Sequence, residues 1–484
     1  MQRLSRRGLL RLVGGASIGA LLSACAPKIV EVTKIVKEKE VVKETVVVQG
    51  TPQVVEKEVT KVVEKEVTKV VEKQVPAPQG PITLIIMHVH PAYDAFGQKT
   101  ADPKFEELHA NVKIKRELVP GWIAEFYPKL ITMHAAGTPW DVAQLPHSGI
   151  LYAMYSKGVF KDLSPLVEVG QFKLEQFVPA SVEGGKNASG AFFMMPILID
   201  NGDSLIVWNK DLLDKAGVPE PTPEWRFDSD FRGALQKLKG KLAKGEYTTH
   251  EVWANNLYGA EAVLANSSLR CLDDTGRKWQ LGDGKGKACL KLWADMAKEG
   301  LVPKAGEMPA GAGDIFNSGK MAFLQTFLPV YIWYKGVVKD TFKVGTTYMP
   351  KGPEPDGVTS GIANLHFMGL SADSKNIEMG WEYLKFFTGT EMAQPLWDAG
   401  LMPARIDTWQ KNANLPGADA AYKLALDVYP KIRPPCQAWN FRTQELWDAY
   451  TNVSGKIWLG QVDFDQGIDE TAKAVDEVLN KPMA

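Results

Sequence analysis

The stretch VVEKEVTKVVEKEVTKVVEK at residues 54–73 repeats every eight residues and most constrains how this chain can fold. A straight helix would rotate the valine stripe by about 80° with each repeat, so no single apolar face would persist. With a period of two, the odd positions alternate valine and lysine, while the even ones are mostly glutamate and threonine. An isolated chain therefore has no apolar face to bury here, and any globular fold must lie elsewhere.

Two interpretations of residues 26–80 stay open. One is an extended or disordered charged tether, and the other is a stalk in which several chains run parallel. The segment ends at VPAPQGP, residues 75–81, because prolines and glycine stop regular structure. A linker of this length would span roughly 40 Å as a random coil. We expect the globular part to occupy residues 81–484.

The N-terminus, MQRLSRRGLLRLVGGASIGALLSAC, has a basic start, an apolar stretch and small residues before a cysteine. This pattern predicts an export signal over residues 1–25. It does not predict a membrane-spanning helix, because the apolar stretch is shorter than the ~20 residues that such a helix needs. Arg6 and Arg7 resemble the twin-arginine motif. Leu22-Ser23-Ala24-Cys25 resembles a bacterial lipobox, which implies lipidation of Cys25 and an extracytoplasmic protein anchored to the cell membrane.

Three further cysteines, Cys271, Cys289 and Cys436, allow one disulfide among themselves in an oxidising compartment. The segment LRCLDDTGRKWQLGDGKGKAC suggests a strand, a tight turn and a helix start, which could bring Cys271 to Cys289. We therefore predict a Cys271–Cys289 bridge, with buried free thiols as the alternative.

The remaining residues, about 400, are enough for two lobes with their own cores. The formal net charge is −1, and no basic block lies outside the tether, so we expect no nucleic-acid partner. The 14 tryptophans require either a large core or a ligand to cover them.

Predicted strands alternate with predicted helices. ITLIIMHVH (82–90), VKIKREL and WDVAQL are expected strands, and IAEFYPKLITMHAAG is an expected helix that ends at Gly137. NIEMGWEYLKFF predicts another helix, with Asn376 as N-cap and Trp381 in the core. The alternation indicates an α/β fold with a mostly parallel sheet, whose ligands bind beyond the carboxyl ends of the strands.

Several segments follow one another in a characteristic order, among them Trp208-Asn209-Lys210-Asp211, Ser318-Gly319-Lys320-Met321-Ala322 and VGTTYMPKGPEPDGVTSGIANLHFMGLSADSKN. Their order resembles that in the extracellular solute-binding proteins that serve ABC importers of sugars. The resemblance covers nearly all of the chain after Pro81. It rests on the order and spacing of motifs that are individually weak.

The resemblance implies a two-lobed periplasmic-binding-protein fold with three crossings, near residues 196–203, 352–359 and 389–401. Lobe 1 would comprise residues 81–198 and 358–392, and lobe 2 residues 199–357 and 393–484. It further implies a monomer that closes on a carbohydrate and delivers it to ABC permease subunits. No catalytic group and no cofactor are expected, because closure needs only contacts that are better in the closed state.

Sugar rings stack on aromatic side chains, and their hydroxyls need polar partners, so candidate residues combine these types with a strand end or crossing. For lobe 1 and the first crossing we predict His88, His90, Trp122, His147, Ser148 and Asp200 as ligand-binding residues. Capping of a strand edge is the alternative for the two first histidines, and core packing for Trp122. The H-x-H spacing also suits a metal, but no third ligand accompanies it, so no metal site is predicted.

For lobe 2 and the return segment we predict Trp253, Asn255, Phe327, Tyr331, Trp333, Asn364, His366, Arg405 and Trp439. The segment Phe327-Leu328-Pro329 departs from the small residues of the family, so which aromatic side chain faces the ligand is left open. Asn364 and His366 replace a small and an aromatic residue, which suggests a polar ligand different from the commonest sugars. Hydrogen bonding at a helix end is the alternative for Asn255.

Two classes of function follow. The first is a lipid-anchored binding protein for a carbohydrate, expected to be an oligosaccharide, with sugar phosphates, polyamines and peptides as competing ligands. The second is an anchored carbohydrate-active enzyme, which would need two carboxylates about 5–10 Å apart. No motif presents such a pair, and the first class is preferred.

Overall fold

The computed structural model describes the chain in two compact units, residues 1–80 and residues 81–484. The described residues are 30–33, 40–48, 51–59, 68–71 and 80–481, except 121, 146–150, 188, 201–204, 252–256, 274–276, 281–283, 305, 310, 340, 354–356, 358–361 and 433–441. Each unit is considered by itself.

The first unit contains four short strands that pair within one chain. Strand β1 (Val30–Thr33) is antiparallel to β4 (Thr68–Val71), and β2 (Glu40–Val48) is antiparallel to β3 (Thr51–Val59). The backbone is extended, as valine and threonine favour. These strands are extended, and the choice between a charged tether and a parallel stalk of several chains stays a prediction.

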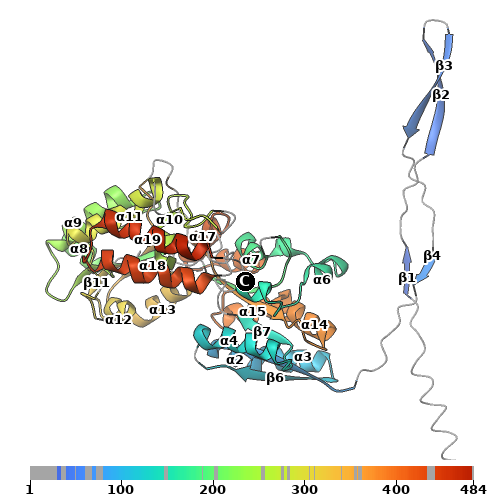
Figure 1. Ribbon diagram of the computed structural model, residues 1–484, viewed down its shortest axis with the longest axis horizontal. Coiled ribbons are helices and arrows are strands. Elements are labelled where there is room, and N and C mark those ends of the chain that lie inside the picture. Colours follow the sequence, from blue (N-terminus) through green and yellow to red (C-terminus); the bar gives the residue numbers. More distant parts are fainter. Residues whose placement is uncertain are drawn as a thin grey trace, which may run out of the picture. The chain divides into compact units, whose positions relative to one another are not determined.

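The second unit is built on two sheets, each with its own helices (Figure 1). We call the five-stranded sheet and its helices lobe 1. Its strand order is β6-β5-β7-β13-β8, where the strands are β5 (Ile82–His88), β6 (Val112–Leu118), β7 (Val142–Leu145), β8 (Met195–Asp200) and β13 (Asn364–Leu370). Strand β5 is a continuous apolar run because helices cover it, as is usual for parallel strands.

The helices of lobe 1 are α2 (Pro91–Phe96), the π-helix η2 (Gly97–Ala101), α3 (Asp102–Leu108), α4 (Trp122–Ala135), α5 (Leu151–Ser156), α6 (Ser164–Val169), the 3-10 helix η3 (Leu174–Gln176), α7 (Pro179–Gly184), α14 (Ile377–Thr388) and α15 (Thr390–Asp398). Two of these helices, α4 and α14, lie close to segments predicted as helices. Phe126 and Leu130 on α4 are fully buried, and Trp381 on α14 is buried as predicted.

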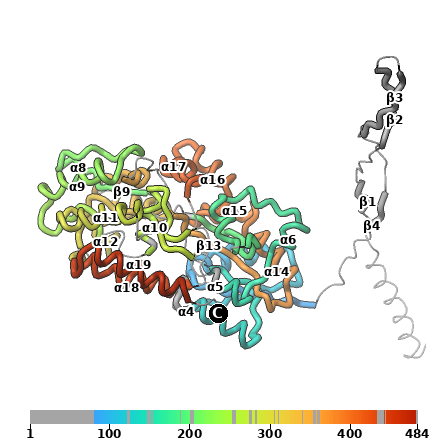
Figure 2. The backbone as a smooth tube through the Cα atoms, turned by 45° about the horizontal axis from the view of Figure 1, so that its top comes forward, coloured from blue at the N-terminus to red at the C-terminus, as the bar shows by residue number. Residues whose placement is uncertain are grey.

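We call the four-stranded sheet and its helices lobe 2. Its strand order is β10-β11-β9-β12, where the strands are β9 (Leu205–Asn209), β10 (Tyr247–Thr249), β11 (Met321–Thr326) and β12 (Val344–Tyr348). The helices are α8 (Lys210–Ala216), the π-helix η4 (Phe227–Phe231), α9 (Arg232–Lys239), α10 (Leu257–Ala265), α11 (Gly284–Lys298), α12 (Ala312–Asn317), α13 (Leu328–Val338), α17 (Ala420–Val428), α18 (Thr443–Trp458) and α19 (Phe464–Leu479). Helices α18 and α19 lie side by side (Figure 2).

Both sheets are mixed, which corrects the expectation of a mostly parallel sheet. In lobe 1, β5 is parallel to β6 and β7, but β13 is antiparallel to β7 and β8. In lobe 2, β9 is antiparallel to β11 and β12. The sequence pattern of a buried strand is the same for either direction, so it could not distinguish them.

The chain passes between the two sheets more than once. It leaves lobe 1 after β8 and enters lobe 2 at β9, and it returns between β12 and β13. After α15, residues Met402 to Arg405 run beside β8, with Ile199 N–H donating to the Met402 carbonyl at 3.0 Å. Helix α16 (Ile406–Ala413) follows, and α17 packs on β12. Each sheet therefore contains strands from distant parts of the sequence.

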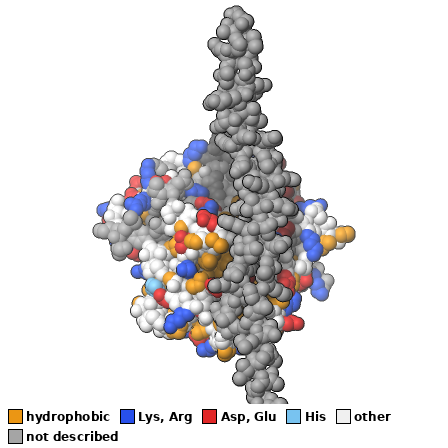
Figure 3. Space-filling view, turned by 90° about the vertical axis from the view of Figure 1, so that its right-hand side faces the viewer, with side chains coloured by type: hydrophobic (Ala, Val, Ile, Leu, Met, Phe, Trp, Pro, Cys, Tyr) orange, Lys and Arg blue, Asp and Glu red, His pale blue; other side chains and the backbone are white. Residues whose placement is uncertain are grey.

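Two large apolar clusters form the core of this unit. One includes Leu84, Ile86 and Leu370 of lobe 1, and the other includes Trp293 and Phe323 of lobe 2. On the face shown in Figure 3, basic and acidic side chains of the described residues are intermixed, in keeping with the net charge of −1. The two apolar clusters contain many of the aromatic side chains of the chain.

Candidate functional site

One edge of the lobe 1 sheet gathers several predicted ligand residues. Strands β5, β7 and β8 run in the same direction and β13 runs opposite, so the ends of the first three meet the start of the last. His88 ends β5, Asp200 ends β8, and Asn364 begins β13 in direct register with Asp200. Because ligands of α/β folds bind beyond the carboxyl ends of strands, this edge is the candidate site.

Helix α2 covers part of this edge and brings two predicted histidines to one tyrosine. His90 is the N-cap of α2, and its Nδ1 accepts a hydrogen bond from the Ala92 N–H at 3.1 Å. The His90 ring stacks on Tyr93 with centroids 4.7 Å apart. The Tyr93 hydroxyl is hydrogen-bonded to Nδ1 of His366, which lies on β13. His90 and His366 are half-buried, whereas Tyr93 is buried.

A buried polar network lies at the same end of the sheet. Arg116 on β6 donates to both carboxylate oxygens of Asp102, at 2.5 and 2.9 Å, and to the Tyr383 hydroxyl at 2.8 Å. It also donates to Oε1 of Gln144 on β7 at 3.0 Å. Gly97 makes room for this arrangement, because a Cβ atom there would come within 2.0 Å of the Arg116 guanidinium carbon.

His88 lies beside this network and is almost fully buried. Its Nε2 is 3.2 Å from Asp94 Oδ1, but without the geometry of a hydrogen bond. Burial, and next the charge of Arg116, lower the pKa of His88. Burial and the nearby His366 lower the pKa of His90. Both imidazoles are therefore held in the neutral form.

Several other predicted residues of both lobes are described incompletely or not at all. Trp122 is the first residue of α4, and Asp200 the last of β8, but their side chains are not described. His147, Ser148, Trp253, Asn255 and Trp439 lie outside the described residues, as does Cys25. Their roles stay predictions.

The predicted aromatic residues of lobe 2 have different environments. Phe327 is the half-buried N-cap of α13, and Trp333 on the same helix is 53% exposed. Tyr331 is buried in the first apolar cluster, and burial and the hydrogen bond to Asp419 raise its pKa. Tyr331 therefore packs between α13 and its neighbours, and its role as a ligand-facing ring stays a prediction.

Arg405 is also engaged away from the candidate edge. Its guanidinium is bound to Asp407 at 2.6 and 3.1 Å and lies over the ring of Phe177. The backbone of Arg405 bridges to Phe177, on the side of β8 remote from Asp200. The prediction of Arg405 as a ligand-binding residue is therefore not supported by its contacts.

The predicted Cys271–Cys289 bridge is wrong. Cys289 is a free, buried thiol, whereas Cys271 is disulfide-bonded. Cys289 lies on α11 with its Sγ 3.6 Å from Ser267 Oγ, so it is directed at the end of α10. Cys271 instead lies beside Gln280, whose N–H donates to its carbonyl. Both cysteines are buried in the second apolar cluster, but they are not bonded to each other.

Three residues of the edge were missed from the sequence, namely Tyr93, Arg116 and Gln144. Tyr93 could have been found, because HPAYDAF places it one turn after an N-capping histidine. Arg116 is one of several charged residues in VKIKREL, and Gln144 is a single polar residue in an otherwise apolar strand. Their connection depends on strand pairing and had no local signal.

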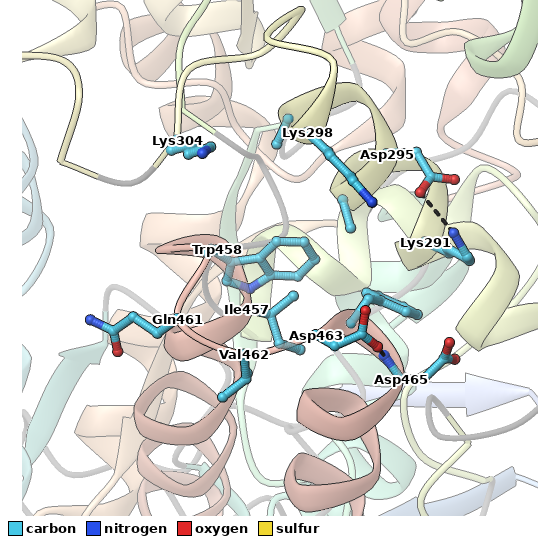
Figure 4. Close-up of a pocket in the computed structure, with 14 residues that line it drawn as sticks. Lys291, Asp295, Lys298, Lys304, Ile457, Trp458, Gln461, Val462, Asp463 and Asp465 are labelled. Carbon is cyan, nitrogen blue, oxygen red and sulfur yellow. Dashed lines mark hydrogen bonds and ion pairs between the residues drawn. The ribbon is translucent and has the colours of Figure 1, made fainter.

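The cavity drawn in Figure 4 lies away from this edge, where α11 ends and α18 turns into α19. Its volume is about 450 Å³, and Lys291 and Asp295 form an ion pair of 2.7 Å in its wall. Charged residues of both signs line it in equal number, namely Lys291, Lys298, Lys304, Asp295, Asp463 and Asp465. None of the predicted ligand residues lines it.

Two searches of the described residues were negative. No three His, Cys, Asp or Glu side chains among them are placed to hold a metal ion. No helix in the described part of the chain combines the length and the apolar character needed to cross a membrane.

The fold is that of a two-sheet α/β binding protein, and comparisons with solved structures agree. The sugar-binding protein of Xanthomonas citri superposes with a TM-score of 0.69 at 18% identity, covering 82% of this chain and 97% of that one. The ABC substrate-binding protein of Listeria monocytogenes, solved in complex with cycloalternan, gives a TM-score of 0.67 at 18% identity and covers 82% and 98%.

Sequence comparison defines the family. The profile of the bacterial extracellular solute-binding proteins matches residues 90–394, and this chain belongs to that family. A binding protein of Brucella abortus is 24% identical over 393 residues, which are 78% of this chain and 88% of the relative. The protein is thus a solute-binding component of transport and not an enzyme.

Proposed function

We propose that this protein captures a carbohydrate, and specifically an oligosaccharide, between its lobes and delivers it to the permease of an ABC importer. The observation that carries the proposal is the polar edge of lobe 1. There Asn364 lies opposite Asp200, the last residue of β8, His366 lies two residues further along β13, and His90 is the N-cap of the helix that follows β5. Such groups suit hydroxyl-rich ligands, whose buried oxygens need partners.

Structural relatives support the choice of ligand class. One neighbour was solved with the oligosaccharide cycloalternan, and another is a sugar-binding protein. A ligand held by both lobes would shift the protein toward a closed state only through contacts that are better in that state. We expect the two passages of the chain, after β8 and before β13, to act as hinges for such closure.

The test is titration of the purified protein with maltose, maltotriose, cycloalternan, glycerol 3-phosphate and spermidine, followed by calorimetry and X-ray scattering. A bound oligosaccharide at a hundredfold over its Kd should stabilise the protein by about 2.7 kcal/mol. The radius of gyration should fall at the same concentrations. Binding of none of the sugars at millimolar concentration would contradict the proposal.

Asp200→Asn should weaken oligosaccharide binding by about tenfold or more, because a hydrogen bond to a charged group contributes about 1.5–3 kcal/mol. The matched control is Asp214→Asn, an exposed carboxylate on α8. Both variants should unfold at the temperature of the wild type within a few degrees. Equal affinity of the two variants would remove Asp200 from the site.

We also propose that Cys25 carries a lipid that anchors the mature protein, as LSAC before the valine-rich repeat suggests. Cys25→Ser should move the protein from the membrane fraction to the medium or leave the unprocessed precursor. Persistence of a processed variant in the membrane fraction at high salt would contradict the anchor.

A further inference from the structure

His90, Tyr93 and His366 make one connected group, which we call the histidine–tyrosine unit. Tyr93 stacks on His90 at 4.7 Å between ring centroids and meets His366 edge-on at 5.6 Å. Its hydroxyl is hydrogen-bonded to His366 Nδ1. The unit joins the start of α2 to the start of β13, although 273 residues separate Tyr93 from His366. A single side chain thus sets the placement of two imidazoles at the candidate edge.

The backbone fixes the protonation state of one imidazole. His90 Nδ1 accepts from the Ala92 N–H, and a backbone N–H can only donate, so this nitrogen carries no proton. The neutral ring must then carry its proton on Nε2, which is a hydrogen-bond donor. In His366, Nδ1 is likewise occupied by Tyr93, so its Nε2 stands on the far side of the ring from that bond.

Charged and titratable groups around the unit come from three elements. Asp94 is on α2, and His88 is on β5 with Arg116 of β6 close to it. His366, which belongs to the unit, lies on β13. Asp94 is occupied by Gln98, whose side chain donates to it at 2.9 Å. Burial, and next the charge of His366, lower the pKa of His90, and protonating both imidazoles would place two like charges near each other.

We infer that Tyr93 is a positioning residue for the ligand site. The unit then donates a hydrogen bond to an oxygen atom of a hydroxyl, phosphoryl or carboxylate group of the ligand, and it does not bind an ammonium group. The inference rests on the proposed function and narrows its ligand class. A neutral imidazole with its proton on Nε2 can donate to an oxygen lone pair. It has no acceptor for the N–H groups of a polyamine at that atom, so sugars and sugar phosphates fit and polyamines do not.

The variant Tyr93→Phe tests the contribution of the hydroxyl apart from that of the ring. The variant keeps the stacking on His90 and loses the bond to His366, so its affinity for the oligosaccharide should fall about tenfold. The matched control is Tyr155→Phe, a buried ring of lobe 1 that stacks on Phe193 at 4.6 Å and whose hydroxyl makes no hydrogen bond. Tyr155→Phe should bind like the wild type, and His366→Gln should resemble Tyr93→Phe.

The pH profile separates positioning from a merely structural role. The pKa of His90 lies below the usual value of about 6.5, so affinity should be complete above that pH and should fall as the pH drops through the lowered pKa. Protonation of Nδ1 removes the acceptor for Ala92 and adds a charge beside His366. Tyr93→Phe should shift the midpoint of this profile, because it releases His366, while Tyr155→Phe should not.

A measurement without ligand tests the same geometry. The chain has seven histidines, so nitrogen-15 NMR can resolve their tautomers in the unliganded protein. We expect His90 to be protonated on Nε2 at pH 7.5, and Tyr93→Phe to move the His366 signals. A proton on Nδ1 of His90 would overturn the assignment of the donor.

The outcomes distinguish the inference from the proposed function. If an oligosaccharide binds and both tyrosine variants match the wild type, the inference fails and the function stands. If spermidine binds and no sugar does, both fail. If no probe binds, the function fails, and the NMR tautomer alone decides whether Tyr93 positions the two imidazoles.

Discussion

Replacing Arg116 by methionine is expected to lower the free energy of unfolding by about 3–5 kcal/mol, the usual cost of breaking a buried ion pair. The Arg116 side chain is 4% exposed and that of Asp102 is 11% exposed. Burial alone would lower the pKa of Arg116, but Tyr383 and Asp102 outweigh it and raise the pKa. Without the guanidinium, the only partner left to the Asp102 carboxylate among the described residues is the Tyr383 hydroxyl, at 2.7 Å, so a buried negative charge would lack a cation.

The control for this variant lies one residue away on the same strand. Lys115 points to the opposite face and pairs with Glu117 at 2.8 Å, with the two side chains 61% and 31% exposed. Because exposed pairs contribute about 0–1 kcal/mol, Lys115→Met should change stability little. Urea unfolding followed by circular dichroism measures both variants. A loss of under 1 kcal/mol for Arg116→Met would show that the network contributes little to stability.

Much of the fold could be predicted locally because its elements have strong patterns. The apolar run of β5, the buried face of α4 and the packing of Trp381 on α14 follow from periodicity and are confirmed. The direction of β13 could not be predicted. The direction depends on where the chain re-enters the sheet of lobe 1 after passing through lobe 2. The local sequence NLHFMGL does not indicate that position.

The candidate site was predictable only in part, for a related reason. The predicted strand at 82–90 placed His88 at the end of β5 and His90 two residues beyond it, whereas Asn364 was chosen only through the resemblance to the family. What joins such residues is tertiary contact, as between Tyr93 and His366 or between Arg116 and Tyr383, which are 267 residues apart. The sequence shows each of these polar residues separately but does not show which of them are in contact. An aromatic residue in a helix, such as Tyr331, fits a core and a ligand site equally well, so the sequence pattern could not choose between them.

Replacing Cys271 by serine is expected to lower the free energy of unfolding by about 2–4 kcal/mol, the typical contribution of a disulfide. Cys271 is disulfide-bonded and fully buried, so the variant loses the cross-link and also buries a hydroxyl. Cys289 is free, and Cys289→Ala should cost about 1 kcal/mol or slightly more, since it removes only one buried sulfur atom.

The response to reductant identifies which cysteine forms the bridge. Dithiothreitol should destabilise the wild type and Cys289→Ala equally, because both retain the cross-link, and should leave Cys271→Ser unchanged. In the unreduced wild type, iodoacetamide should label Cys289 only after denaturation, since the thiol is buried in α11 beside Ser267. Loss of the reductant response in Cys289→Ala, or a Cys271–Cys289 peptide in the mass spectrum, would restore the pairing that the sequence suggested.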